Sequence, residues 1–188
     1  MLRVLDDDAV QKWCTERQLR VTDAFYPSFE PVVHNGLFVE YPDSPCRHST
    51  LASDLVCLSD EGNLHDRFEG GLWILLEAGT WDDFGDLATR NFLLQTCGFD
   101  PDAEDCRAIE FDTASATEVF TLFFLCTSFR WDFAFIHRAG TIFIVNWHDE
   151  FMCIVARDAS KLANVAAALQ RWSPVQKEKY LVAQGFGY

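Results

Sequence analysis

Hydrophobic residues follow their most regular pattern between residues 131 and 157. Three β-rich runs, 131–137, 141–147 and 151–157, are separated only by the polar stretches RAG and HDE. Connections this short favour antiparallel neighbours, so the pattern predicts a three-stranded meander. In the middle run both sets of alternating positions are largely hydrophobic, which predicts a strand at the centre of a sheet.

Hydrophobic residues at helical spacing, together with capping residues, mark the expected helices. These are 7–19, a short helix near 48–58, 80–97 with Thr80 as N-cap, 112–129 capped by Asp112 or Thr113, and a last helix that begins after Asp158 or Ser160 and stops at Pro174. The 112–129 segment is hydrophobic nearly all round, which predicts that it is buried. The last helix carries one hydrophobic stripe that ends at Trp172.

Shorter hydrophobic runs predict further strands. Residues 29–41 hold two such runs around Asn35-Gly36, a dipeptide favoured in tight hairpin turns. The stretches GGLWILLEAG and RAIEF predict a buried strand and a short strand. Together the elements predict an α+β fold, in which an antiparallel sheet of about five or six strands packs helices mainly on one face. The 188 residues fit a single domain, 1–188, with a loosely held tail at 174–188.

Composition and charge narrow the expected function. Hydrophobic residues make up 49% of the chain, which excludes a disordered protein. The net charge of -14 repels phosphate backbones, so direct binding to nucleic acid is not expected. The same charge favours a protein partner with a basic surface. An acidic surface that serves only solubility is the alternative.

The cysteines and the lack of targeting segments predict a cytoplasmic location. The seven Cys are odd in number, form no C-x-x-C pair and lie mostly in hydrophobic segments, as expected in a reducing compartment. The amino-terminal stretch MLRVLDDDAVQKW becomes acidic before a signal-peptide core could develop. No segment approaches the about 18 apolar residues that a membrane helix needs, so no membrane association is expected.

Two groups of residues are candidates for contact with a partner. An acidic group next to Phe99 lies in an expected loop, where no helix end explains its charge; its members are Asp100, Asp102, Glu104 and Asp105. The other group closes the expected central strand and comprises Trp147, His148, Asp149 and Glu150. Loops between ordered elements commonly carry binding residues, so both groups are predicted to bind the partner. A solvated loop is the alternative for the acidic group.

The sequence gives little support for a metal site, a cofactor site or a catalytic site. His148 with its neighbouring carboxylates lacks the spaced ligands of a metal site, so neither a metal nor a cofactor is predicted. Serine-hydrolase, P-loop and Rossmann motifs do not occur. Cys46 and His48 could form a nucleophile site with Arg47 lowering the thiol pKa, but only if SPCRHST is extended. A small cytosolic enzyme that uses Cys46 or His148, and an adaptor subunit, therefore remain alternatives.

The stretch WDFAFIHRAGTIFIVNWHDEFMCIVARD resembles the carboxy-terminal portions of small acidic bacterial proteins, including immunity proteins that accompany polymorphic toxins. The likeness covers about the last forty residues and rests mainly on strand periodicity, so it transfers no site residues. It implies a cytosolic inhibitor that binds and blocks one toxin. With the charge, it leads to the hypothesis of a non-enzymatic binding protein that occludes a basic active site.

Overall fold

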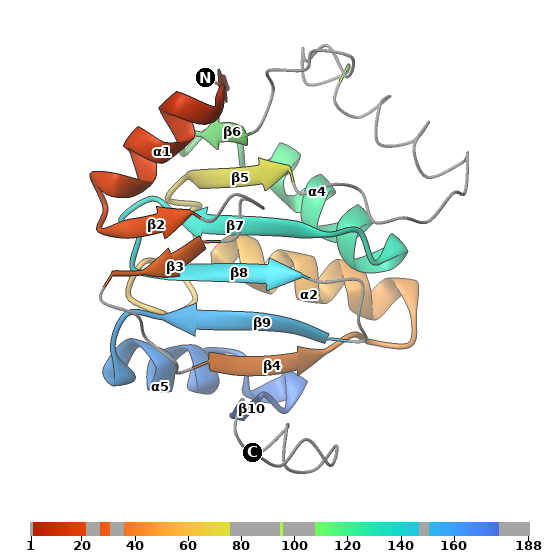
Figure 1. The fold of residues 1–188 in the computed structure, drawn as a ribbon. Helices are drawn as coiled ribbons and strands as arrows, with labels where there is room; N and C mark the ends of the chain where they lie inside the picture. The colour runs from red at the N-terminus through yellow and green to blue at the C-terminus, as the bar shows by residue number, and fades with distance from the viewer. Residues whose placement is uncertain are drawn as a thin grey trace.

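The computed structural model describes residues 2–21, 27–30, 36–75, 95, 108–146 and 151–176. Within these residues one antiparallel sheet has eight strands in the order β1-β6-β5-β7-β8-β9-β4-β10 (Figure 1). The strands are β1 Arg3–Leu5, β4 Gly36–Glu40, β5 Gly71–Leu75, β6 Ala108–Phe111, β7 Phe133–His137, β8 Ile142–Asn146, β9 Phe151–Ala156 and β10 Val175–Gln176. A separate antiparallel pair consists of β2 Leu19–Val21 and β3 Pro27–Phe29.

Helices cover both faces of the large sheet. They are α1 Asp7–Thr15, α2 Pro45–Cys57, α4 Ala116–Phe129, α5 Ala159–Ala168 and the 3₁₀ helix η1 Gln170–Trp172. One hydrophobic cluster joins α2, α4 and α5 to one face of the sheet. A second cluster joins α1 and the β2–β3 pair to the opposite face, and the two layers are visible in Figure 1.

The α+β class and the antiparallel sheet are confirmed, whereas the expected strand number and helix placement differ from the structure. The described part of the sheet has eight strands, not five or six. The additional edge strands β1 and β10 have three and two residues, too few to show an alternating pattern. The helices do not leave one face open, because α1 and the β2–β3 pair cover it.

The meander predicted from residues 131–157 is confirmed. Strands β7, β8 and β9 are consecutive antiparallel neighbours. In β8, Ile142 and Ile144 pack in the cluster shared with α2 and α4, while Phe143 and Val145 pack in the cluster shared with α1. Strand β8 is therefore buried on both faces, as its hydrophobic pattern predicted.

The hairpin predicted over 29–41 around Asn35-Gly36 is not formed by β3 and β4, and residues 31–35 of that prediction lie outside the described residues. Strand β3 pairs with β2, and β4 pairs with β9 and β10. Gly36 begins β4, and a Cβ built there would lie 3.1 Å from Cys153 Sγ on the neighbouring strand. The glycine therefore permits a close approach between strands.

The predicted N-cap residues agree with the structure for α5 but not for α4. Asp158 caps α5 by accepting a hydrogen bond from the Lys161 N–H at 2.9 Å, as predicted. The N-cap of α4 is Ser115, because Asp112 instead accepts from the Ser115 hydroxyl and the Ala114 N–H in the preceding turn. The helix predicted at 80–97 lies outside the described residues except for Gln95.

Helix α4 is buried on one side, so the prediction that it is buried holds only for the side that faces the sheet. Val119 and Phe123 are fully buried against the sheet. Phe120 and Phe124 on the outer side are half-buried, and Phe129 in the last turn is 45% exposed. The apolar outer positions that obscured the helical stripe in the sequence are thus partly open to solvent.

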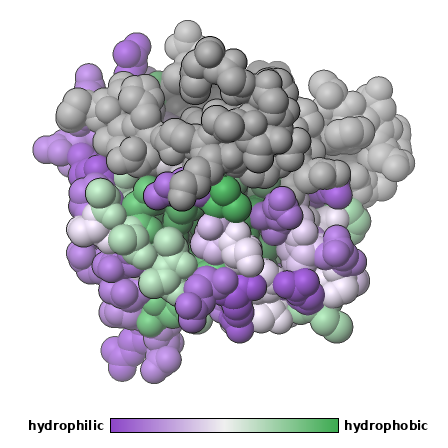
Figure 2. Space-filling model, turned by 90° about the horizontal axis from the view of Figure 1, so that it is seen from below, coloured by the Kyte–Doolittle hydropathy of each residue, from purple (hydrophilic) through white to green (hydrophobic). Residues whose placement is uncertain are grey.

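Polar contacts join neighbouring elements on each face of the sheet. Asp54 on α2 is 5% exposed and accepts hydrogen bonds from Arg171 Nε at 2.6 Å and Trp172 Nε1 at 2.7 Å. On the other face, Arg157 donates to the carbonyls of Arg17 and Gly140. Beyond the β4–β10 edge, hydrophilic side chains surround smaller hydrophobic areas (Figure 2).

Candidate functional site

One end of the sheet gathers strand termini from across the fold. The residue pairs at this end are Ile74–Ala108, Leu75–Phe133, Phe133–Asn146, Asn146–Met152 and Glu40–Phe151. Helix α4 ends at Phe129, and Arg130 and Trp131 lead directly from it into β7 at the same end. The described residues that flank the connections at this end therefore lie in one region of the molecule.

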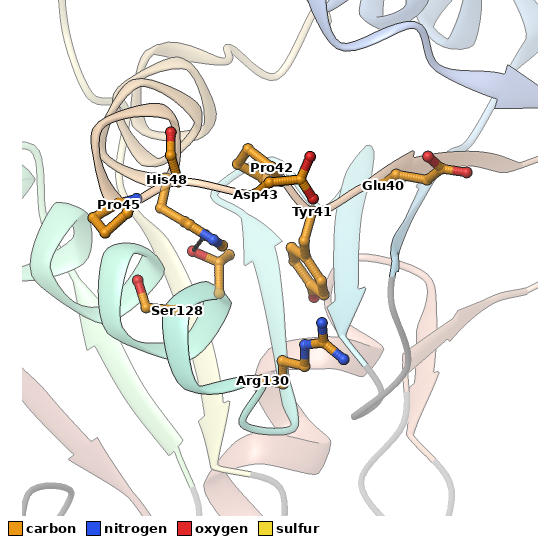
Figure 3. Close-up of a pocket in the computed structure, with 10 residues that line it drawn as sticks. Glu40, Tyr41, Pro42, Asp43, Pro45, His48, Ser128 and Arg130 are labelled. Carbon is orange, nitrogen blue, oxygen red and sulfur yellow. Dashed lines mark hydrogen bonds between the residues drawn. The ribbon is translucent and has the colours of Figure 1, made fainter.

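A cleft of about 520 Å³ opens at this end, between the β4–α2 connection and the last turn of α4. Its lining comes from two segments far apart in the sequence and is almost entirely polar; the residues are Glu40, Tyr41, Pro42, Asp43, Ser44, Pro45, His48, Thr127, Ser128 and Arg130. Figure 3 shows the two walls: the β4–α2 connection with His48 on one side, and the end of α4 on the other.

Local sequence explains the shape of both walls. Pro45 occupies the first turn of α2, where its fixed φ suits the start of a helix. Ser44 before it has an extended backbone and makes no side-chain capping bond. On the opposite wall, Arg130 ends α4 in the left-handed conformation with φ 57°. The buried Asn146 holds the following segment by donating to the Trp131 carbonyl at 2.5 Å.

His48 connects the two walls. Its Nδ1 lies 3.4 Å from Thr127 Oγ1, and the Thr127 hydroxyl donates to the Phe123 carbonyl at 2.8 Å. The His48 and Tyr41 rings are stacked with centroids 6.3 Å apart and planes 26° apart. Burial lowers the pKa of His48, with the Arg130 charge acting in the same direction and a bond to the Pro42 carbonyl opposing it. The imidazole is therefore neutral at pH 7.

The charged groups of the cleft are separated by sign. Glu40 and Asp43 are exposed on the β4–α2 side, and Arg130 is exposed on the α4 side. In Figure 3 the Arg130 guanidinium lies beside the hydroxyl end of Tyr41, whereas the Asp43 carboxylate lies across the cleft. The arrangement can hold a polar or charged group between unlike walls and next to two aromatic rings.

The predicted partner-binding residues are not described by the structure. Asp100, Asp102, Glu104, Asp105, Trp147, His148, Asp149 and Glu150 all lie outside the described residues. Their flanking residues are described: Leu75 and Ala108 precede and follow one segment, and Asn146 and Phe151 the other. All four of these flanking residues lie at the end of the sheet that carries the cleft.

The Cys46–His48 pair considered from the sequence is not formed. Both residues lie in α2, where successive side chains turn by about 100°, so positions two apart point to nearly opposite sides. Cys46 is an exposed free thiol, while His48 faces the cleft. Elsewhere, burial raises the pKa of Cys14 to about 12, which leaves that thiol protonated.

His137 is a core residue. It ends β7, is 1% exposed, and packs edge-on against Phe135 at 5.1 Å. Burial lowers its pKa to about 4, so the ring is neutral. Within the described ranges, no three His, Cys, Asp or Glu side chains gather as metal ligands.

Sequence reasoning did not single out Tyr41, Ser128 or Arg130. The local signal was the stretch YPDSPCRH, in which two prolines around Asp-Ser mark a turn that leads into a helix. The other wall of the cleft gave no local signal, because the contact between His48 and Thr127 joins residues 79 positions apart. A single sequence does not reveal that separation as a contact.

Comparisons with known proteins gave no family assignment: no family model, no curated protein and no solved structure matches the chain. Among the described helices, none combines the length and the hydrophobicity of a membrane-spanning segment.

Proposed function

We propose that the protein is a non-enzymatic binding protein, of the immunity-protein kind, that covers a basic site on a protein partner. The observation that supports the proposal is the meeting of strand ends at one end of the sheet. The segment with Asp100, Asp102, Glu104 and Asp105 and the segment 147–150 are each flanked by residues at that end. A partner docked at that end would lie beside the described residues that flank both segments.

The distribution of charge along the sequence also supports a basic partner. Residues 76–107 hold eight of the 29 acidic residues and two of the 15 basic residues. The exposed Glu40 and Asp43 add carboxylates beside the cleft. A concentrated negative field accelerates the encounter with a basic surface and orients the partner.

Aromatic side chains at the same end could supply the short-range part of the affinity. Phe129 is 45% exposed and stacks on Trp131, with ring centroids 5.3 Å apart. Tyr41 is half-buried in the wall of the cleft. Aromatic residues that lose water on binding commonly carry a large share of interface energy.

The proposal is tested by association kinetics with the partner recovered from a native lysate. A variant with Asp100→Asn, Asp102→Asn, Glu104→Gln and Asp105→Asn should associate several-fold more slowly at low salt, because electrostatic steering raises on-rates about 10-fold or more. The dissociation rate should change less. Stopped-flow measurements across a salt series give both rates.

A second fourfold variant provides the matched control. Glu16→Gln, Glu30→Gln, Glu61→Gln and Asp66→Asn remove the same charge from exposed positions on other parts of the molecule. This control should retain most of the association rate. Equal rates for the two variants, or an association rate that salt does not change, would contradict electrostatic capture at the proposed surface.

A further inference from the structure

The cleft beside α2 combines features that suit one basic side chain. Two exposed carboxylates, those of Glu40 and Asp43, stand on the β4–α2 side. Two aromatic rings, Tyr41 and the neutral His48, also line the cleft, with planes 26° apart. Carboxylates bind guanidinium groups through paired hydrogen bonds, and aromatic faces attract cations.

Size and shape favour arginine over other basic groups. A volume of about 520 Å³ exceeds what a single ion fills and lies within the range of cavities that hold small ligands. A guanidinium is planar, so it can stack on an aromatic ring while its edge donates to a carboxylate. The ammonium of lysine offers one of these contacts at a time.

We propose that the cleft receives an arginine side chain of the partner, stacked beside Tyr41 and His48 and paired with Asp43. The inference rests on the proposed function, because it supplies a specific anchor for the basic partner. It adds a defined pocket to a contact that long-range charge alone would leave unspecific.

Arg130 limits what the cleft accepts. Its guanidinium lies on the α4 side, across the cleft from Asp43 (Figure 3). A bound arginine is attracted to the carboxylates and repelled by Arg130, so it should lie against the β4–α2 wall. Arg130 also opposes entry of a second cation and contributes specificity by repulsion.

The signs of these charges make the inference testable without the partner. The probe is N-acetyl-arginine amide, titrated into the full chain at constant ionic strength and followed through the NMR signals of the His48 ring. Asp43→Asn and Glu40→Gln should each weaken probe binding about two- to fivefold, the range of exposed ion pairs. Arg130→Gln should strengthen it by a similar factor, because a like charge is removed.

Two further readouts separate binding in the cleft from general attraction to an acidic protein. Arg138→Gln and Asp66→Asn, which change exposed charges away from the cleft, should leave the dissociation constant unchanged. The bound probe should lower the pKa of His48 further, because a second cation beside the ring disfavours its protonation. Melting curves of each variant establish that it is folded.

The outcomes distinguish this inference from the proposed function. Reversed signs, with Arg130→Gln weakening and Asp43→Asn strengthening binding of acetate or phosphate, would assign an anion to the cleft and overturn the inference. No saturable shift of His48 with the arginine probe would also overturn it. Either result leaves the salt series with the protein partner as an independent test of the acidic surface.

Discussion

Asp54 is the buried carboxylate on which the contact between α2 and η1 depends. Its two oxygens accept from the Arg171 guanidinium and from the Trp172 indole, so a charge at 5% exposure is fully engaged. Asp54→Ala would leave the buried indole N–H without an acceptor. We expect a loss of about 2 kcal/mol in the free energy of unfolding, measured by urea denaturation and tryptophan fluorescence.

The control for this prediction is Ser53→Ala, an exposed neighbour on the same helix. It should change the free energy of unfolding by less than about 0.5 kcal/mol. A loss of that small size for Asp54→Ala as well would show that the contact between α2 and η1 does not depend on the carboxylate.

Two titratable groups near the β7–β8 turn, the buried His137 and the half-buried Asp60, respond to acid in opposite directions. Burial lowers the pKa of His137 to about 4 from its ordinary 6.5, so its contribution to stability is present above pH 6.5 and is lost as the pH falls toward 4. Burial raises the pKa of Asp60 to about 6 from 3.8, so its contribution is present below pH 3.8 and is lost as the pH rises through about 6.

The difference between variants isolates the histidine. Between pH 6.5 and 4 the wild-type chain should lose stability relative to His137→Leu, with a slope of at most roughly 1.4 kcal/mol per pH unit for one proton. Over the same fall in pH, the wild-type chain should gain stability relative to Asp60→Asn. Urea denaturation at a series of pH values gives both differences, and parallel curves for wild type and His137→Leu would contradict the assignment.

Thiol exposure gives a third prediction at the residue scale. Cys46 is exposed, whereas Cys14, Cys126 and Cys153 are buried. A thiol reagent at neutral pH should therefore label Cys46 quickly and the three buried thiols only on unfolding. In Cys46→Ser the fast phase should fall by one thiol per chain. A fast phase that persists undiminished would mean that Cys46 is shielded in solution.

At the scale of elements, Gly140 controls how α1 meets the β7–β8 turn. It has φ +67°, and a Cβ built there would lie 2.6 Å from the Cβ of Arg17. Arg17 in turn donates to the Arg138 carbonyl at 2.8 Å and lies over the Trp13 ring at 3.7 Å. Substitution at Gly140 therefore disturbs the junction between the helix layer and the sheet.

We expect Gly140→Ala to lower the free energy of unfolding by about 1–3 kcal/mol, from backbone strain and displacement of Arg17. The neighbouring Ala139→Ser, at an exposed position, is the control and should be nearly neutral. Thermal melting followed by circular dichroism measures both. An unchanged melting temperature for Gly140→Ala would show that the junction adapts without loss.

Elements set by neighbouring residues were predictable, and elements set by distant contacts were not. The β7–β8–β9 meander follows from adjacent residues, so the sequence alone predicted it, and the sequence also limited the cap of α5 to Asp158 or Ser160. The pairing of β4 with β9 joins residues that are distant in the chain, and Gly36 resembled a turn residue for that reason. Strands of two or three residues, such as β1 and β10, are too short to carry a pattern.

For the molecule as a whole, the sequence predicted the acidic character but not the cleft. The net charge of -14 pointed to a basic partner. The cleft depends on tertiary structure, because Glu40 and Asp43 precede α2 while Arg130 follows α4. These two segments lie close together because α2 and α4 pack against each other on the same face of the sheet.

The strand order also has a consequence for synthesis on the ribosome. Strand β4 ends at Glu40, but its neighbours β9 and β10 begin at Phe151 and Val175, and β5 has to wait for β6 at Ala108. At roughly 5–20 residues per second, β9 emerges on the order of ten seconds after β4. Throughout that interval the apolar side chains of β4 lack their strand partners, so the nascent chain should rely on chaperones until its last third is made.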